Sequence, residues 1–411
     1  MLCVSGNCAN AKTLIEAGAA TADILLATTA SDEVNMLCCL IGKKLGAAYT
    51  IARIRDPQYN DSLMLLQSEL GIDTTINPER ATALEISRLL RFPFANNIES
   101  FAKGHVEMVE FRPSANDAVV GHPLHELSSV LPNHPRVLYA ALERRDGEVI
   151  IPSGNDVIAP GDRVFVAGDL VSITNYFRSL GKNSLRVKNV MIMGGGRISY
   201  YLARIIVPMG INVTMIEIDP DKAATLSEQL PKVKVILGDG TDQELLEQLG
   251  LGSMDAYIAL SDRDEENLMT GLFASRLSVP KVIVKNNRHN YAGLINDLGL
   301  DSIVSPKAIT GANILRYVRA RVSSEGTTIE KLYRLLDGKA EALEFNVHAG
   351  APYINVPLKD LNVASGAIVA VIVRRGKVIV PFGNDHIEAG DSVIIVTRST
   401  AIHDLNEVLK R

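Results

Sequence analysis

The chain has 411 residues, of which 47% are hydrophobic and 22% charged, and it carries a net charge of −5 at neutral pH. This length predicts about two to four globular domains, while the acidic balance, the lack of Trp and the 5% aromatic content argue against a nucleic acid partner. No apolar run approaches the roughly 20 residues of a membrane-spanning helix, so we expect no direct membrane insertion. The four cysteines lie in the first 39 residues without CxxC spacing, which predicts a reducing compartment and no disulfide framework.

Two kinds of segment each occur twice along the chain. Residues 23–27 match residues 255–259 at an offset of 232, and residues 147–152 match residues 376–381 at an offset of 229. A tandem duplication explains both matches, because unrelated segments rarely align so many Gly, Pro and Asp residues by chance. The predicted domains therefore alternate: an N lobe at residues 1–94, a C lobe at 105–182, a second N lobe at 188–322 and a second C lobe at 328–411.

The two N lobes are predicted to be unequal. Residue 1 is equivalent to Val233, so the first repeat has no counterpart of residues 188–232 in this sequence. We therefore expect the first N lobe to be incomplete.

The second N lobe alternates short apolar runs with segments of helical periodicity. Strands are predicted at residues 189–193, 212–217, 233–237, 256–260, 281–285 and 303–304. One helix is predicted to begin near residue 198 and to end at Pro208 and Gly210, which do not continue a helix. Further helices are predicted at residues 221–230, 244–249, 265–277 and 294–298. This alternation predicts an α/β fold with a Rossmann-like, doubly wound parallel sheet. Residues 311–321 predict a long helix that leaves the lobe.

The C lobes have a different pattern, with short strands separated by Gly-containing turns. In the second C lobe, strands are predicted at residues 343–347, 368–374, 377–380 and 392–397, and a closing helix at 401–409. This pattern predicts a small α+β unit. Linkers are predicted at residues 95–105, 181–188 and 323–328.

A glycine-rich turn after the strand at residues 189–193 is the strongest functional signal. Gly194-Gly195-Gly196-Arg197-Ile198-Ser199 follows the dinucleotide fingerprint G-x-G-x-x-G, with Ser in the third position. Glu217 ends the next strand, 21 residues after Gly196, where an acidic residue binds ribose hydroxyls and repels a 2′-phosphate. The spacing favours NAD(H) or an adenosine nucleotide over NADP(H), and a Rossmann shell without a ligand is the alternative.

Other candidates follow from the expected position of strand ends. Asp239 follows the third strand, where an adenine would lie, and Arg197 could hold a phosphate bidentately or be a solvated surface residue. The complete set of predicted cofactor-binding residues is Gly194, Gly195, Gly196, Arg197, Ile198, Glu217, Asp239, Gly240, Leu260, Ser261 and Lys285.

The first repeat offers a second, weaker candidate site at equivalent positions. Its residues are Gly6, Asn7, Thr28, Thr29, Arg53 and Arg55. Because the sequence contains no phosphate-binding glycine turn for this repeat, we expect weak binding or none.

No catalytic set accompanies the fingerprint. None of the 11 tyrosines has Lys four residues later, no Gly-x-Ser-x-Gly elbow or Walker loop occurs, and the eight histidines are scattered. We therefore expect no catalytic residues and no metal site, and a sensor rather than an enzyme. An NAD-dependent dehydrogenase is the less favoured alternative.

The chain resembles RCK domains, which regulate potassium conductance. The resemblance rests on residues 194–199, Glu217, 238–239, 261–267, 383–385 and 390–391, and in the first repeat on residues 27–35 and 51–55. The tandem order of lobes is similar to that of the TrkA family, the cytosolic regulatory subunits of bacterial Trk potassium-uptake systems. Two departures from the family pattern are the lack of a glycine fingerprint in the first repeat and Ser199 in place of the third Gly.

The resemblance implies the fold, the ligands and the partners. It implies tandem RCK repeats, each with a Rossmann-like lobe and a small α+β C lobe, that bind NAD(H), with ATP or ADP as alternative ligands. It also implies a cytoplasmic ring, commonly a tetramer, peripheral to the inner face of the plasma membrane on a TrkH/TrkG-type potassium-transporting protein. Another cation transporter or antiporter is the alternative partner. By the same resemblance Gly194, Gly196 and Arg197 hold phosphates, Glu217 the ribose, Asp239 the adenine and Lys285 a phosphate or ribose.

Overall fold

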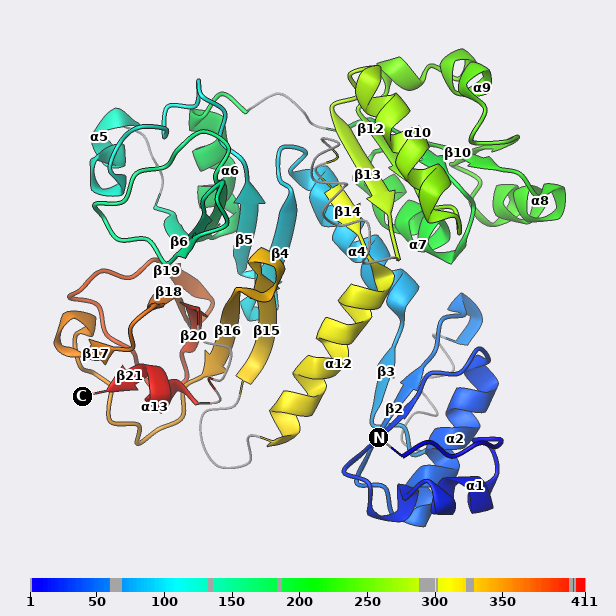
Figure 1. The fold of residues 1–411 in the computed structure, drawn as a ribbon, viewed down its shortest axis with the longest axis horizontal. Coiled ribbons are helices and arrows are strands. Elements are labelled where there is room, and N and C mark those ends of the chain that lie inside the picture. The colour runs from blue at the N-terminus through cyan, green and yellow to red at the C-terminus, as the bar shows by residue number, and fades with distance from the viewer. Residues whose placement is uncertain are drawn as a thin grey trace. The chain divides into compact units, whose positions relative to one another are not determined.

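The computed structural model describes residues 2–59, 69–131, 136–182, 187–287, 300, 302–322, 329–398, 402 and 404–410. The chain forms two compact units, shown in chain-order colours in Figure 1. The first unit contains Met1–Ser87 and Lys188–Asn313, and the second contains Arg88–Val187 and Ile314–Arg411. Each unit therefore takes one segment from each repeat. Helices α4 (Pro78–Arg91) and α12 (Pro306–Val322) each run across a boundary between the units.

A six-stranded parallel sheet forms the second-repeat part of the first unit. Its strands are β9 (Asn189–Met193), β10 (Asn212–Glu217), β11 (Lys234–Leu237), β12 (Ala256–Ala259), β13 (Lys281–Lys285) and β14 (Ser302–Val304). They lie in the order β11-β10-β9-β12-β13-β14, and every pair is parallel. This order is that of a doubly wound dinucleotide-binding sheet, so the predicted fold class is confirmed.

The described helices of this sheet differ in how they begin. They are α7 (Arg197–Ile206), α8 (Pro220–Gln229), α9 (Gln243–Gln248) and α10 (Asp264–Arg276). Asp219 and Asp242 accept hydrogen bonds from first-turn amides of α8 and α9, which fixes where these helices start. Helix α12 starts at Pro306 rather than at residue 311, because proline suits the first helical position. The predicted helix at residues 294–298 lies outside the described residues.

The first repeat contributes a three-stranded parallel sheet to the same unit. Its strands are β1 (Ile24–Ala27), β2 (Tyr49–Arg53) and β3 (Thr74–Ile76), with helices α1 (Ala11–Glu16) and α2 (Asp32–Leu45). Strands β1 and β2 and helix α2 start 232 residues before β12, β13 and α10, which confirms the duplication. The four cysteines are free, and Cys38 and Cys39 are buried in the core of this lobe.

The second unit contains two five-stranded sheets of matching order. The first-repeat sheet has the order β4-β5-β8-β6-β7, with β4 (Asn97–Phe101), β5 (Val106–Phe111), β6 (Leu138–Glu143), β7 (Val149–Ile150) and β8 (Arg163–Gly168). The second-repeat sheet has the order β15-β16-β20-β18-β19, with β15 (Ile329–Leu335), β16 (Ala340–Asn346), β18 (Ala367–Arg374), β19 (Lys377–Ile379) and β20 (Ser392–Thr397). Helices α5 (Leu127–Val130) and α6 (Leu170–Ser179) complete the first of these lobes.

One apolar core joins the two C lobes. Phe101 and Phe165 of the first repeat belong to the same buried cluster as Leu335 and Val371 of the second. The Ala102 amide also donates to Glu344 Oε2 at 3.0 Å. The C lobes are thus packed together as a single unit rather than as two separate domains.

Two predicted segments of the C lobes differ in the structure. Residues 97–101, within the predicted linker at 95–105, form strand β4, because Ile98 and Phe101 are buried and the segment pairs with β5. The predicted helix at 401–409 is reduced to α13 (Leu405–Val408), since Asp404 caps the Asn406 amide and starts the helix there. Strand β21 (Leu409–Lys410) then pairs with β17 (Asn362–Val363). Within the described part of the chain, every helix is too short or too polar to cross a bilayer.

Candidate functional site

The glycine turn lies at the carboxyl end of β9, where the strand order of the sheet reverses. Gly194 has φ +92°, and its amide donates to the Ile216 carbonyl at 2.9 Å. A Cβ atom at this position would lie only 3.1 Å from the Ser261 nitrogen and 3.2 Å from the Leu260 carbonyl carbon. Glycine is therefore required at 194, because the turn is left-handed and packs directly on the end of β12. This reversal point is where doubly wound sheets bind ligands.

The other two fingerprint positions, Gly196 and Ser199, lie at the start of α7. Gly196 is the N-terminal cap of α7, and a Cβ atom there would meet no atom within 4 Å. Ser199 is fully buried and donates to the Gly194 carbonyl at 2.5 Å. The serine thus ties the helix to the turn, so this departure from the third glycine is accommodated by a hydrogen bond rather than by close backbone packing alone.

The N-terminus of α7 is suited to an anion. No side chain caps it, so its first-turn amides have no side-chain acceptor. Arg197 is exposed at the first helical position and forms no hydrogen bond or ion pair with the other described residues. The partial positive charge of the helix end and the guanidinium together favour a phosphate group.

Glu217 lies beneath the turn and holds it. Its side chain is 8% exposed. Its Oε2 accepts from the Gly195 amide at 2.7 Å and its Oε1 from the Asp219 amide at 2.9 Å. The carboxylate therefore links the end of β10 to the glycine turn in the structure, and its predicted contact with a ribose stays a prediction.

A cavity of about 380 Å³ lies over the turn. Its lining residues are Gly195, Gly196, Arg197 and Tyr200 from the turn and α7, Asp219, Asp221, Lys222, Thr225, Leu226 and Gln229 from α8 and its cap, and Asp56, Pro57 and Gln58 from the first repeat. This volume is within the range of small-molecule sites, which is roughly 300–1,000 Å³. Three of the predicted residues, Gly195, Gly196 and Arg197, therefore share one cavity.

Other predicted residues lie around the strand ends but do not line this cavity. Asp239 accepts from the Thr241 amide at 2.9 Å and from its hydroxyl at 2.7 Å, and these bonds lower the pKa of the carboxyl. Gly240 is buried, and a Cβ atom there would lie 2.4 Å from Met193 Cγ. Ile198, Leu260 and Lys285 are also buried.

The Lys285 side chain forms an ion pair with the acidic side chain of Asp262. Its Nζ lies 2.9 Å from Asp262 Oδ1, and this contact lowers the pKa of Asp262. Its predicted role with a phosphate or ribose remains a prediction. Among the described residues, no group of three or more His, Cys, Asp and Glu side chains is placed to hold a metal ion.

Sequence reasoning missed most of the cavity's walls. The position of the α8 residues could have been predicted from the sequence, because they directly follow the strand that ends in Glu217. Asp56, Pro57 and Gln58 follow β2 of the first repeat, and no local pattern connects them to a turn more than 130 residues later in the chain. Their contribution depends on tertiary structure alone.

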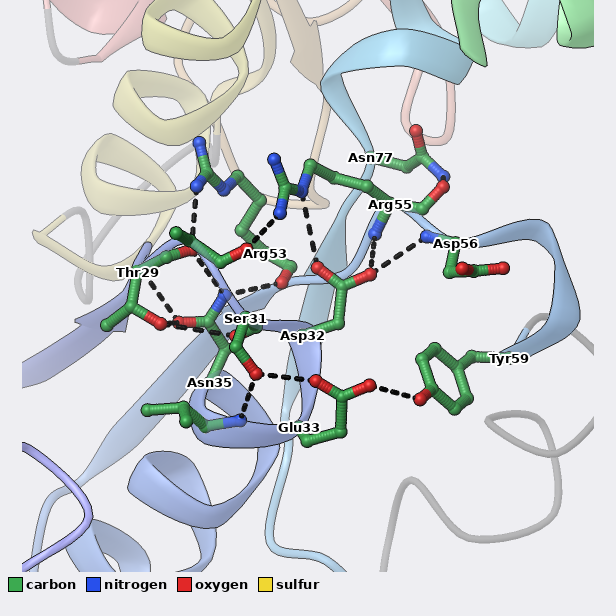
Figure 2. A network of polar contacts seen from close by, with 12 residues as sticks. Thr29, Ser31, Asp32, Glu33, Asn35, Arg53, Arg55, Asp56, Tyr59 and Asn77 are labelled. Atoms are coloured by element: carbon green, nitrogen blue, oxygen red, sulfur yellow. Dashed lines mark hydrogen bonds and ion pairs between the residues drawn. The ribbon is translucent and has the colours of Figure 1, made fainter. Parts of the chain in front are cut away.

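Three of the first-repeat candidates, Thr29, Arg53 and Arg55, belong to a polar network within the lobe, shown in Figure 2. Asn35 Oδ1 accepts from the Thr29 amide at 2.7 Å, and its Nδ2 donates to the Arg53 carbonyl at 2.8 Å. Arg53 donates to the Thr29 carbonyl at 2.7 Å. Asp32 accepts from the Arg55 amide at 2.7 Å and lies 3.3 Å from the Arg55 guanidinium. We call these five residues the repeat-one clasp.

The other residues predicted for this site lie apart from the clasp's contacts. Asn7 is exposed and accepts from the Ala9 amide at 2.9 Å, and Gly6 packs against the Thr13 side chain. Thr28 is exposed at the end of β1. Thr29, Arg53 and Arg55 thus use polar groups to join α2 to the strand ends, and a ligand role for them stays a prediction.

The second repeat has a matching set of contacts, which we call the repeat-two clasp: Ser261, Asp264, Asn267, Lys285 and Asn287. Asn267 Oδ1 accepts from the Ser261 amide at 2.9 Å, and its Nδ2 donates to the Lys285 carbonyl at 3.0 Å. Asp264 accepts from the Asn287 amide at 3.0 Å. Asn35 and Asn267 are both fully buried. The two clasps are therefore equivalent structural features.

Comparison with known proteins gives the following matches. The TrkA-N domain model matches residues 1–78 and 190–306, and the TrkA-C domain model matches residues 108–181 and 342–410. The chain is 31% identical over 415 residues to "Trk system potassium uptake protein TrkA homolog 2" of Methanosarcina mazei, covering 99% of this chain and 90% of that protein. It is 32% identical to "Trk system potassium uptake protein TrkA" of Haemophilus influenzae, covering 95% of this chain and 85% of that protein.

Two solved structures share the fold. The GsuK RCK domain superposes with a TM-score of 0.59 at 17% identity and covers 98% of this chain and 83% of its own. The GsuK channel bound to NAD superposes with a TM-score of 0.58 at 17% identity, covering 95% of this chain and 68% of its own. At this identity the likeness shows the fold alone.

Proposed function

Because the chain belongs to the TrkA family of Trk-system potassium uptake proteins, we propose that it is a nucleotide-sensing regulatory subunit of potassium uptake. It assembles as a cytoplasmic ring, a homotetramer, on a TrkH/TrkG-type membrane protein at the inner face of the plasma membrane. Its ligand is NAD(H), with ATP or ADP as alternatives. The relatives' names supply the potassium-uptake role, and the NAD-bound GsuK channel is a protein of the same fold with that ligand.

The open start of α7 is the observation that carries the nucleotide proposal. Gly196 has free space where a Cβ atom would stand, and it lines a cavity beside an exposed Arg197. A pyrophosphate at this point would meet the first-turn amides and the guanidinium. Asp219 and Asp221 line the same cavity, and their carboxylates disfavour the additional 2′-phosphate of NADP(H).

The composition of the cavity supports a sensor rather than an enzyme. None of its described lining residues is His, Cys or Ser, so the cavity offers no serine or cysteine nucleophile paired with a histidine base. Helix α12 begins in the unit that holds the cavity and ends in the unit that holds the C lobes. A nucleotide that favours one conformation of the first unit can therefore change the conformation of the second unit through α12. Such a change is a population shift rather than a reaction.

The test is calorimetric titration of the purified chain with NAD⁺, NADH, NADP⁺, ADP and ATP, together with Gly196→Val. The valine should abolish binding by filling the approach to the α7 amides, while the melting temperature without ligand stays unchanged. Gly311→Val is the matched control, because Gly311 also has no atom within 4 Å of an added Cβ and lies far along the chain in α12. At one hundred times its dissociation constant, a bound nucleotide should stabilise the native state by about 2.7 kcal/mol.

Function is tested by reconstitution. Mass photometry of the chain should give a tetramer, and potassium flux through a TrkH-type protein in liposomes should depend on the nucleotide with wild type but not with Gly196→Val. Equal binding by wild type and Gly196→Val would contradict the site. Nucleotide binding without any effect on TrkH-type flux would contradict the potassium role and favour another cation transporter or antiporter as the partner.

A further inference from the structure

The cavity over the glycine turn has a wall from the other repeat. Asp56, Pro57 and Gln58 follow β2 of repeat one and line the same cavity as Gly196 and Arg197 of repeat two. Both segments belong to the first unit. We call residues 56–58 the repeat-one wall. A nucleotide that fills the cavity from the glycine turn would therefore lie against a segment of the first repeat.

A buried tyrosine of α7 holds this wall in place. Tyr201 is 5% exposed, and its hydroxyl donates to the Arg55 carbonyl at 2.8 Å. The same hydroxyl accepts from Asn77 Nδ2 at 3.0 Å, and Asn77 Nδ2 also lies 3.3 Å from the Arg55 carbonyl. Because Tyr201 lies one turn after Arg197 on α7, the helix that starts at the glycine turn is bonded to the residue that precedes the wall.

The repeat-one clasp holds the wall from the other side. Asp32 Oδ2 accepts from the Arg55 amide at 2.7 Å and from the Asp56 amide at 2.8 Å. The backbone that enters the wall is thus fixed by three hydrogen bonds from repeat one, two to Asp32 and one from Asn77, and by one from Tyr201 of repeat two. Such a segment is preorganised, so a ligand that contacts it pays little ordering entropy.

We propose that repeat one supplies part of the nucleotide site of repeat two: the wall contacts the bound nucleotide, the Asp56 carboxylate selects against the more negatively charged ligands, and Tyr201 is the positioning residue. This inference rests on the proposed nucleotide site. It adds that residues 56–58 determine which nucleotide binds and report its presence to the first repeat.

The charges around the cavity support the selectivity. Asp56, Asp219 and Asp221 line it, opposed by Arg197 and Lys222. Lys222 Nζ lies 3.7 Å from Asp219 Oδ2, while Asp56 Oδ1 accepts only from the Gln58 amide, at 2.9 Å, among the described residues. Asp56 therefore presents an uncompensated negative charge to the cavity. A triphosphate carries more negative charge than NAD⁺, so the repulsion is larger for ATP.

The selectivity is tested with Asp56→Asn, which removes the charge and keeps an oxygen acceptor for the Gln58 amide. Calorimetric titrations with ATP and NAD⁺ should show that the affinity for ATP relative to NAD⁺ rises about three- to tenfold at low salt and less at high salt. Asp23→Asn is the matched control, because Asp23 is an exposed carboxylate of the same lobe at the opposite, amino end of β1. It should leave the ratio unchanged.

The positioning role is tested with Tyr201→Phe. We expect the NAD⁺ affinity to fall roughly three- to tenfold, and the protection from hydrogen exchange that NAD⁺ gives to residues 55–58 to be lost. Tyr257→Phe is the control, since Tyr257 is a buried tyrosine of the same lobe whose hydroxyl contacts Met193 Sδ. It should leave both measurements unchanged.

The outcomes separate the inference from the function on which it rests. If wild type bound none of these nucleotides, the proposed site and the wall would both be wrong. If wild type and Gly196→Val differed as expected but Asp56→Asn kept the wild-type ratio and residues 55–58 gained no protection, the nucleotide site would stand and the wall would be refuted.

Discussion

The two clasps join the same elements of the two repeats and differ in charge. In repeat one Asn35 connects Thr29 to the Arg53 carbonyl, and in repeat two Asn267 connects Ser261 to the Lys285 carbonyl. Each buried amide bridges the end of one strand, the start of a helix and the end of the next strand. Both repeats therefore fix their crossover helix in the same way.

The differences lie around this shared bridge. In repeat one Asp32 pairs with the Arg55 guanidinium, while in repeat two the equivalent Asp264 faces the neutral amide of Asn287. Repeat two places its charged contact at the surface, between Lys285 and Asp262. Repeat one thus has an internal ion pair at its strand ends, and repeat two has a pair of neutral and charged hydrogen-bonding groups at the equivalent position.

The comparison separates scaffold from site. The Thr/Ser, Asp and Asn residues that open α2 and α10 recur in both repeats because both need the crossover fixed, so this pattern does not by itself indicate a ligand. What distinguishes the second repeat is the left-handed Gly194, the open Gly196 and the cavity above them. We therefore expect changes in the clasps to affect stability and changes in the turn to affect binding.

The largest effect should come from removing the bridging amides. Asn35→Ala and Asn267→Ala each leave buried backbone groups without partners, so we expect each to lower the local opening free energy by about 2–4 kcal/mol. Hydrogen exchange of residues 24–35 and 256–267 measures this in the respective repeats. Asn7→Ala, which removes an exposed asparagine, is the control. A large effect in one repeat only would end the equivalence of the clasps.

A smaller and unequal effect should follow neutralisation of the aspartates. Asp32→Asn loses the ion pair with Arg55 and should cost about 1–3 kcal/mol. Asp264→Asn should cost less than about 1 kcal/mol, because the amides of residues 264 and 287 can reorient to restore their hydrogen bonds. Thermal melting of the two variants without ligand gives the comparison. Equal losses would show that the charge difference between the clasps has no energetic consequence.

The smallest effect concerns an exposed carboxyl beside the repeat-one clasp. Hydrogen bonds from Ser31, at 2.5 Å, and from Tyr59 lower the pKa of Glu33 from its ordinary 4.5 to about 2. Because the folded-state pKa is depressed, the contact stabilises the native state above pH about 4.5, and this contribution is lost as the pH falls through about 2. Solvent screening keeps it small.

Carboxyl-carbon NMR titration measures the pKa of Glu33 directly. Ser31→Ala should raise it more than Tyr59→Phe, since the Ser31 hydrogen bond is the larger cause. Repeat two has Arg263 at the position of Ser31, and that arginine pairs with Glu266 instead. An unshifted Glu33 in wild type would remove this difference between the repeats.

Local sequence patterns predicted the regular elements of the second N lobe closely. Strands β9, β10 and β13 have the predicted bounds, because alternating apolar runs and helix caps are encoded within a few residues. Strand β4 was predicted as a linker, since a five-residue edge segment following Pro93 carries little periodicity. The closing helix was predicted too long, because the Asp404 cap starts it at Leu405 and Leu409 pairs with Val363 after its end.

Only the part of the site whose residues are close together in the sequence could be predicted. The glycine turn and Glu217 follow from spacing along one strand–turn–helix segment. The contacts of Tyr201 with Arg55 and Asn77 join residues 146 and 124 positions apart, and only the folded sheet of both repeats brings them together. The same holds for the repeat-one wall, whose place at the cavity no local pattern indicates.

The alternation of the chain between its two units has an evolutionary consequence. An assembly of two identical chains inherits every substitution twice, once in each copy. Here the two copies lie on one chain, and the apolar core of the C lobes draws Phe101 and Leu335 from different copies. Mutation can therefore alter one copy while the other stays unchanged. Fusion of the duplicates therefore allows the two N lobes to diverge from one another.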